Sequence, residues 1–225
     1  LYSFRSIGWL DYLESSYQTT PVQWLADSPM PWWPKLSFHD HPPLFFLSQH
    51  IFFKILGNSL FTSRLPSVLF GVTSVYLIYL IAKKLLASES AGLITSLMFA
   101  ISFAAVSVSR LAMMESTLFF FILLNVYYFL KFLGDKRKWW KFGLSFGLAI
   151  LTKYIAVFLA PAYLILLIKE KDRPSLKYIL GAAGIALIIF SPVIIYNLLS
   201  YKTFGHFDLQ ISYLLHQKTK SRLYL

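Results

Sequence analysis

The densest group of polar side chains in this apolar sequence is the run Phe38-His39-Asp40-His41-Pro42-Pro43-Leu44. A carboxylate between two imidazoles offers ligands that suit a divalent cation. The two prolines stiffen the backbone and favour the start of a helix directly after them. Two histidines separated by one residue also occur in loops that only form hydrogen bonds. The run therefore allows either a cation site, with Asp40 as the carboxylate ligand, or a hydrogen-bonded loop.

Two acids stand beside apolar stretches, where a carboxylate has chemical uses. Asp11 follows the apolar pair Trp9-Leu10 and is suited to accept a proton from a hydroxyl nucleophile. Glu115 begins an apolar run, and Arg110 lies five residues before it. The simpler alternatives are solvation of Asp11 at a membrane surface and compensation of a helix dipole by Glu115. We expect Arg110 to pair with Glu115 or with a lipid phosphate.

Lys153 interrupts the apolar stretch 142–168. A lysine in hydrocarbon is costly unless its ammonium group reaches water or an anion. Snorkelling to the lipid headgroups and binding of a phosphate both meet that requirement. The sequence has no Walker loop and no GxGxxG, HExxH or GxSxG motif, so it gives no support to nucleotide-binding or hydrolase templates.

The composition is that of a membrane protein with several spans. Of the 225 residues, 57% are hydrophobic and only 14% are charged, against about 25% in soluble domains. The absence of cysteine excludes a disulfide scaffold. The net charge of +11 lies in short clusters between apolar runs, which is typical of membrane-protein loops. We therefore expect contact with membrane lipids and no nucleic-acid partner.

The apolar runs predict an all-α bundle with a core at 65–199. A membrane-spanning helix needs about 20 apolar residues, and residues 142–168 fit either one tilted span or a hairpin of two short helices. Residues 44–56 are too short and polar for a span and predict an interfacial helix in a first loop, 1–64. Residues 200–225 are expected to be the start of a later extracytoplasmic loop. The expected spans are 65–82, 91–109, 116–133, 142–152, 154–168 and 178–199.

Lysine and arginine in the loops predict the orientation. Basic clusters occur in 83–90, 131–141 and 169–177, and a hairpin at 142–168 places all three on one side. The positive-inside rule then makes that side cytoplasmic and favours the hairpin. All five histidines fall on the opposite face. Because the chain begins at Leu1 rather than Met, we expect it to be a piece of a longer protein.

The order of these motifs resembles a known family. Asp11, Asp40-His41-Pro42-Pro43-Leu44, the run at 57–67 (GNSLFTSRLPS), Ser109 to Glu115 and Gly147 to Lys153 occur in the order found in polyprenyl-phosphate-dependent glycosyltransferases of the GT-C fold. The sequence is most similar to the group of protein mannosyltransferases, aminoarabinose transferases and RgtA/B/C/D-like enzymes. The resemblance covers roughly residues 9 to 170 and implies a GT-C transmembrane bundle with juxtamembrane helices on its outer face.

The resemblance also implies roles for single residues. Asp11 matches the acid of the first outer loop, the catalytic base, although the second acid of the family is replaced by Tyr12. Glu115 stands where the family usually has an aspartate in the second outer loop, and we expect it to be a catalytic residue. His41 and Lys153 match positions that touch the donor phosphate, to which we add Arg110. Asp40 matches a metal ligand, and the residue expected to complete that metal site is His216, with His206 a weaker candidate.

The expected activity is transfer of a sugar, with inversion, from an undecaprenyl- or dolichyl-phosphate donor to a protein, lipid or polysaccharide acceptor. The active site is expected on the extracytoplasmic face of the plasma membrane, with a divalent metal cation as a possible cofactor. A transporter or flippase for a lipid-linked or anionic solute is the main alternative, because outer charges also line access paths. Transporters more often show paired interrupted spans in two related halves, and this sequence has one broken stretch. A purely structural membrane subunit leaves the outer acids and histidines unexplained.

Overall fold

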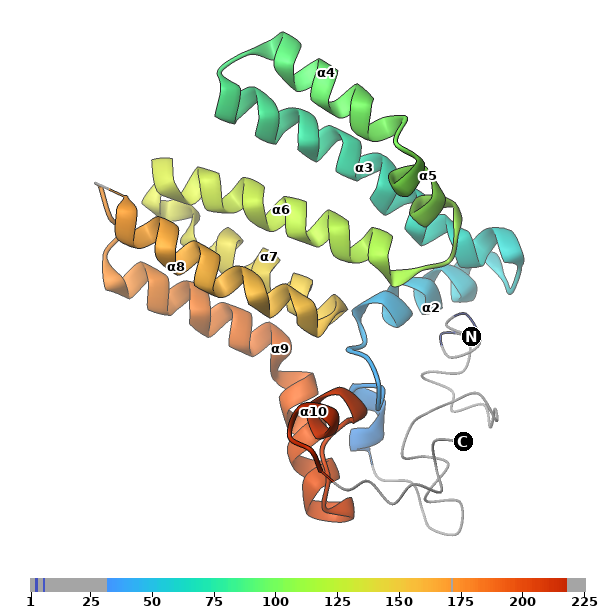
Figure 1. Ribbon diagram of the computed structural model, residues 1–225. Coiled ribbons are helices and arrows are strands. Elements are labelled where there is room, and N and C mark those ends of the chain that lie inside the picture. Colours follow the sequence, from blue (N-terminus) through green and yellow to red (C-terminus); the bar gives the residue numbers. More distant parts are fainter. Residues whose placement is uncertain (1–2, 4–5, 7–31, 171, 218–225) are drawn as a thin grey trace.

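The computed structural model describes residues 3, 6, 32–170 and 172–217, and within these it is helical without strands (Figure 1). The all-α prediction is confirmed. Short 3₁₀ segments are η2 (Trp33–Leu36), η3 (Lys136–Lys138) and η4 (Tyr154–Phe158). The α-helices are α2 (Leu44–Leu56), α3 (Leu60–Leu86), α4 (Glu89–Ala100), α5 (Phe103–Arg110), α6 (Met114–Gly134), α7 (Trp139–Thr152), α8 (Leu159–Lys169), α9 (Leu176–Phe204) and α10 (Leu209–Leu214).

Among the described residues, three helices are long and apolar enough to cross a membrane, namely α3, α6 and α9. They contain the expected spans 65–82, 116–133 and 178–199, and each extends beyond them. The expected span 91–109 is not one straight helix. It is divided into α4 and α5, whose axes differ by 58°. The Ser102 hydroxyl accepts the Ala105 N–H at 3.3 Å and so begins a new helix within the apolar run.

Residues 139–169 fold back on themselves at Lys153. Phe142 in the first turn of α7 packs against Tyr163 and Leu167 near the end of α8. Ala149 near the end of α7 shares a second cluster with Ala156, just after the turn. The two arms are therefore antiparallel, and of the two arrangements expected for 142–168 the structure has the hairpin.

The hairpin brings two basic segments together at the end of the bundle opposite Lys153. The Lys136 ammonium group donates to the Asp172 carbonyl oxygen at 2.7 Å and lies 3.3 Å from the Asp172 carboxylate. The loop between α3 and α4 lies toward the same end (Figure 1). Which face of the membrane this end occupies remains a prediction.

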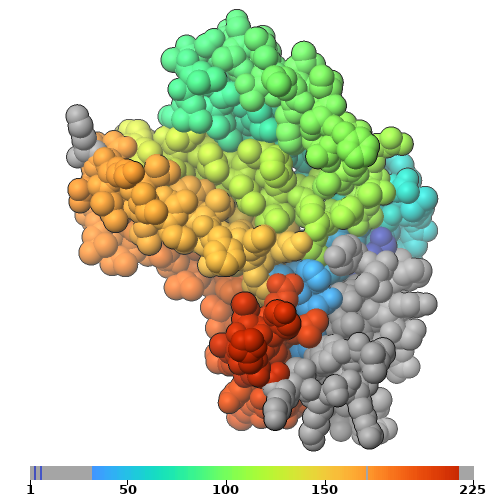
Figure 2. Space-filling model, in the orientation of Figure 1, coloured from blue at the N-terminus to red at the C-terminus, as the bar shows by residue number. Residues whose placement is uncertain are grey.

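The last turns of α9 extend beyond the bundle. The segments that contain Trp33 and Asp208 pack against them. The Trp33 ring meets Tyr196 of α9 edge to face, with ring centroids 5.6 Å apart. Figure 2 shows the tail after α9 (red) against the segment that precedes α2 (blue). The segments that carry Asp40 and Asp208 thus lie beside the Lys153 end of the helices.

Helices α7 and α9 approach closely because glycine stands where they cross. A Cβ added at Gly143 would lie 2.3 Å from the Ala182 carbonyl oxygen, and one at Gly147 would lie 2.8 Å from Ile189 Cβ. Small residues allow helix backbones to pack this closely within a membrane.

We expect Gly143→Ala to lower the free energy of unfolding by about 1–3 kcal/mol, because backbone atoms of α9 must shift. Gly184→Ala is the matched control, since a Cβ there meets nothing within 4 Å. It is expected to be stabilising by about 0.5–1 kcal/mol through helix propensity. Thermal unfolding in detergent measures both changes, and equal midpoints for the two variants would contradict the close crossing.

Candidate active site

The centre of the candidate site is an ion pair at the hairpin turn. The Lys153 ammonium group donates to Glu115 Oε1 at 2.9 Å. The side chains are 28% and 35% exposed, so the pair lies at a surface and not in the bundle core. An ammonium group has three N–H donors, and one is used here. The other Glu115 oxygen, Oε2, is buried and accepts no hydrogen bond from the residues that the structure describes. The pair therefore offers a cation and a carboxylate oxygen to a ligand.

Helix α3 fixes the position of Glu115. Glu115 lies in the first turn of α6. Its neighbour Ser116 donates to the Ser67 carbonyl oxygen at 2.6 Å, and the Ser67 hydroxyl donates to the Met113 carbonyl oxygen at 3.1 Å. These two bonds hold both sides of the turn that carries Glu115.

Asp40 and His41 form a second polar pair. Asp40 Oδ2 lies 3.1 Å from His41 Nδ1, and both side chains are largely buried, at 15% and 17% exposure. The preceding His39 is fully buried, and its ring lies 5.5 Å from that of His206. Burial and the nearby His206 lower the pKa of His39 to about 4, against an opposing effect of Asp40. His39 is thus neutral near pH 7 and belongs to the packing of the site.

The tail after α9 holds this segment in place. The Leu209 N–H donates to the His39 carbonyl oxygen at 2.7 Å, and the Gln210 side-chain amide donates to the Asp40 carbonyl oxygen at 2.6 Å. Residues 170 positions apart in the sequence are therefore joined at the candidate site.

A buried carboxylate that sequence reasoning did not select anchors the tail. Asp208 is fully buried and accepts hydrogen bonds from the Tyr154 hydroxyl, the Asn197 side-chain amide and the Ile211 N–H. The Asp208 N–H in turn donates to Asn197 Oδ1 at 2.8 Å. Since Tyr154 is the residue after Lys153, Asp208 links the hairpin turn to the segment that carries Asp40.

Three signals in the sequence point to this network once it is known. Asp208 stands directly before a short apolar run, which is a helix N-cap pattern. Asn197 is a polar residue within an expected span, and such residues usually have a partner. Tyr154 adjoins Lys153, the one lysine within the apolar stretch 142–168. None of these signals identifies the partner, because the contacts span 11 and 54 residues.

Arg110, the third residue predicted to bind phosphate, is the last residue of α5. Arg110 lines a hollow of about 450 Å³ between α3 and α5 that includes neither Lys153 nor His41. The other residues of this hollow are Leu60, Phe61, Arg64, Leu65 and Val68. Asp11, the predicted base, lies outside the described residues.

The predicted metal site at Asp40 and His216 stays a prediction. His216 lies just past α10 with a left-handed backbone (φ 50°). The described part of the chain contains no group of three or more His, Cys, Asp or Glu side chains placed to hold a metal ion. Among the described residues, Asp40 and His41 form a pair of possible ligands and not a complete set.

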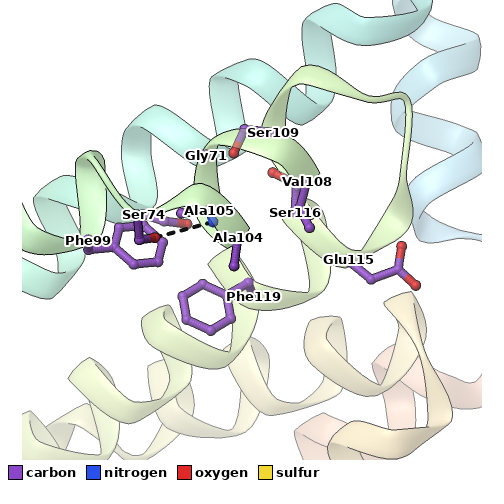
Figure 3. A pocket seen from close by; sticks show the side chains of 11 residues that line it. Gly71, Ser74, Phe99, Ala104, Ala105, Val108, Ser109, Glu115, Ser116 and Phe119 are labelled. Atoms are coloured by element: carbon purple, nitrogen blue, oxygen red, sulfur yellow. Dashed lines mark hydrogen bonds between the residues drawn. The ribbon is translucent and has the colours of Figure 1, made fainter.

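An apolar cavity of about 250 Å³ adjoins the ion pair (Figure 3). It lies between α3, α5 and α6, and Glu115 stands at its rim with its carboxylate pointing away from the ring of Phe119. The ring of Phe119 stacks on Phe99 of α4, with centroids 5.3 Å apart. A charged group and an apolar cavity thus lie side by side.

Comparisons with known proteins match a large part of this chain. A family model described as "Dolichyl-phosphate-mannose-protein mannosyltransferase" matches residues 40–196, which include both polar pairs. A protein of Aquifex aeolicus (strain VF5), named "Uncharacterized protein", is 29% identical over 65% of this chain and 31% of its own length. "Putative mannosyltransferase YycA" of Bacillus subtilis (strain 168) is 30% identical over 68% of this chain and 22% of its own length. The chain therefore spans less than a third of either relative. No solved structure matches it.

We expect Asp208→Asn to lower the free energy of unfolding by about 1–3 kcal/mol, because an amide cannot accept from all three buried donors. Hydrogen exchange of residues 206–215 should increase at the same time, since the tail loses its anchor. Asp172→Asn is the matched control: its side chain is 89% exposed, and an exposed ion pair contributes little. Unchanged exchange in the tail of Asp208→Asn would show that the network does not hold it.

Proposed function

This chain belongs to the dolichyl-phosphate-mannose-protein mannosyltransferase family, and we propose that it transfers a sugar from a polyprenyl-phosphate donor to an acceptor outside the cytoplasm. The observation that carries the proposal is the Lys153–Glu115 pair at the turn of the hairpin. It places a cation and a carboxylate at the end of apolar helices, where the headgroup of a lipid donor meets the protein. The donor class is an undecaprenyl or dolichyl phosphate, and the acceptor class is a protein, lipid or polysaccharide.

In the proposed step, the bond between sugar C1 and the phosphate oxygen breaks as the acceptor oxygen bonds to C1 from the opposite side. The electron pair leaves with the lipid phosphate, and the acceptor proton passes to a carboxylate. Lys153 has two N–H donors left for the phosphate, and His41 supplies a second donor. Donors aimed at a developing charge stabilise the transition state more than the ground state.

The proposal assigns the two carboxylates to different parts of the step. Asp11 is proposed as the base that accepts the acceptor proton. Glu115 holds Lys153 in place through Oε1, and its Oε2 is left to accept from a hydroxyl of the sugar or the acceptor. Because one oxygen of Glu115 is already bound to an ammonium group, the proposal assigns Glu115 to positioning and Asp11 to the proton transfer.

Three further assignments belong to the proposal. Arg110 is proposed to contact a lipid phosphate, although the step above does not need it. A divalent cation at Asp40 and His216 is also proposed, with no step assigned to it. The active face of the protein is proposed to be the extracytoplasmic face of the plasma membrane.

The proposal is tested by incubating the full-length protein in liposomes with a polyprenyl-phosphate sugar labelled in both the lipid and the sugar. Release of free lipid phosphate, with the sugar label in an acceptor, supports transfer. Movement of the intact donor between leaflets without cleavage supports the transporter alternative and overturns the proposal.

We expect Lys153→Ala to weaken donor binding and to lower turnover together, because it removes a cation from an anion site. A charge-assisted hydrogen bond contributes about 1.5–3 kcal/mol, so donor affinity should fall roughly tenfold to a hundredfold. Lys84→Ala is the matched control, a lysine in the last turn of α3 at the other end of the bundle. Normal donor affinity in Lys153→Ala would remove the lysine from the phosphate site.

We expect Asp11→Asn to lower turnover by about 10²–10⁴-fold while donor affinity changes little, since a positioned base contributes about that factor. The two quantities are separated by single-turnover kinetics and equilibrium binding of the donor. Glu14→Gln tests the nearest competing acid. Near-normal turnover in Asp11→Asn, together with an inactive Glu14→Gln, would assign the base to Glu14.

A further inference from the structure

Five basic and aromatic side chains form a continuous patch where α6 ends and α7 begins. The Lys131 ammonium group lies 5.4 Å from the centre of the Tyr127 ring. The Tyr127 ring meets the Tyr128 ring edge to face, with centroids 5.4 Å apart. The Lys141 ammonium group lies 5.5 Å from the centre of the Tyr128 ring and 5.2 Å from that of Trp140. The contacts of this Lys131–Lys141 patch thus cross from α6 to α7.

The two helix ends that carry the patch are held together from inside the bundle. The ring of Phe132 in α6 stacks on that of Phe142 in α7, with centroids 5.7 Å apart. One helical stretch earlier, the Asn125 side-chain amide donates to the Phe142 carbonyl oxygen and to the Ser145 hydroxyl, both at 3.0 Å. Because α6 and α7 are fixed against each other, the two lysines are positioned before a ligand binds, which lowers the entropy cost of binding.

The nearby acid is paired with other basic residues. The Asp135 carboxylate lies 3.6 Å from the Arg137 guanidinium group and 3.7 Å from the Lys138 ammonium group. Within the part of the chain that the structure describes, neither Lys131 nor Lys141 forms an ion pair. Two positive charges of the patch are therefore available to an anion from outside the described chain.

The patch lies at the end of an apolar helix that is long enough to cross a membrane. Lys131 is in the last turn of α6, on the side of the bundle opposite α2 (Figure 1). Trp140 is 44% exposed, whereas a Cβ added at Gly181 of α9 would lie 2.7 Å from the Trp139 ring, so Trp139 belongs to the packing. Tyrosine and tryptophan at the ends of spans lie at the level of the lipid headgroups. The anions at that level are lipid phosphates.

We propose that the Lys131–Lys141 patch binds the phosphate of an anionic phospholipid. Its two ammonium groups attract the negative charge, and the aromatic faces hold these groups in place. A lipid with a choline group brings a positive charge to the same lysines and binds less well. The proposal does not depend on the proposed function, because Glu115 lies in the first turn of α6 and the patch lies at the last.

The test measures lipid binding to the full-length protein in detergent. Phosphatidylglycerol and phosphatidylcholine are titrated separately, and native mass spectrometry gives the dissociation constant of the first bound lipid. Lys131→Ala and Lys141→Ala each remove one charge of the patch. Lys138→Ala is the matched control, because it removes the same charge from a lysine paired with Asp135. Tyr128→Leu removes the ring beside Lys141 without changing the charge.

The wild-type protein should bind phosphatidylglycerol more tightly than phosphatidylcholine. Lys131→Ala and Lys141→Ala should each weaken phosphatidylglycerol binding about fivefold, since a basic residue beside an anionic lipid contributes about that factor. Tyr128→Leu should weaken it about twofold to fivefold, the contribution of an aromatic face to a bound cation. Lys141→Arg keeps the charge and should match the wild type, as should Lys138→Ala. Phosphatidylcholine binding should be equal in all variants.

Equal phosphatidylglycerol affinity in Lys141→Ala and the wild type overturns the proposal. An equal loss in Lys138→Ala and Lys141→Ala also overturns it, because binding then follows the total charge at this end and not the patch. Thermal unfolding without added lipid shows whether each variant is folded. If Lys141→Ala is not, Lys141→Gln removes the charge while keeping most of the side chain, and the same comparison decides.

Discussion

The arrangement of this protein depends on the cost of placing one ammonium group in a long apolar stretch. Lys153 cannot remain in hydrocarbon without water or an anion. The chain meets this constraint by turning at Lys153, so that the lysine lies at a bundle end and reaches Glu115. This reversal at Lys153 makes α7 and α8 antiparallel. It also returns the chain to the basic end of the bundle before α9 begins. One charged residue thus determines both the hairpin and the location of the candidate site.

A second buried charge determines how the polar segments lie on that bundle. Asp208 is fully buried, and each of its carboxylate oxygens is occupied by donors from η4, α9 and α10. A buried carboxylate is tolerated only when it is paired and hydrogen-bonded in this way. Because α10 then bonds to the backbone of His39 and Asp40, the requirement to satisfy Asp208 also places the Asp40 segment. Hydrogen bonds thus join the Lys153 turn and the Asp40 segment of the candidate site, which lie far apart in the sequence.

The sequence predicts the features that depend on local composition. Long apolar runs predicted the all-α class and the spans within α3, α6 and α9, and the family resemblance is confirmed by the match over residues 40–196. Loop charge favoured the hairpin that the structure has. The break at Ser102 was missed, because the run 91–109 contains several serine and threonine residues and its composition does not show which hydroxyl caps a new helix. The partners of Asp208 were missed for a different reason: hydrophobic periodicity carries no information about which distant polar groups meet.

The break between α4 and α5 has a consequence for the biosynthesis of the protein. At about 1.5 Å per residue, the 12 residues of α4 extend about 18 Å and the 8 residues of α5 about 12 Å, so neither crosses a bilayer of about 30 Å alone. Helix α4 instead leans on α3, to which it is joined by the bonds of Glu89 to Lys83 and Tyr79. Because α3 precedes α4 in the sequence, α3 is synthesised first and is present as a packing surface when the two short helices of the bent pair follow it.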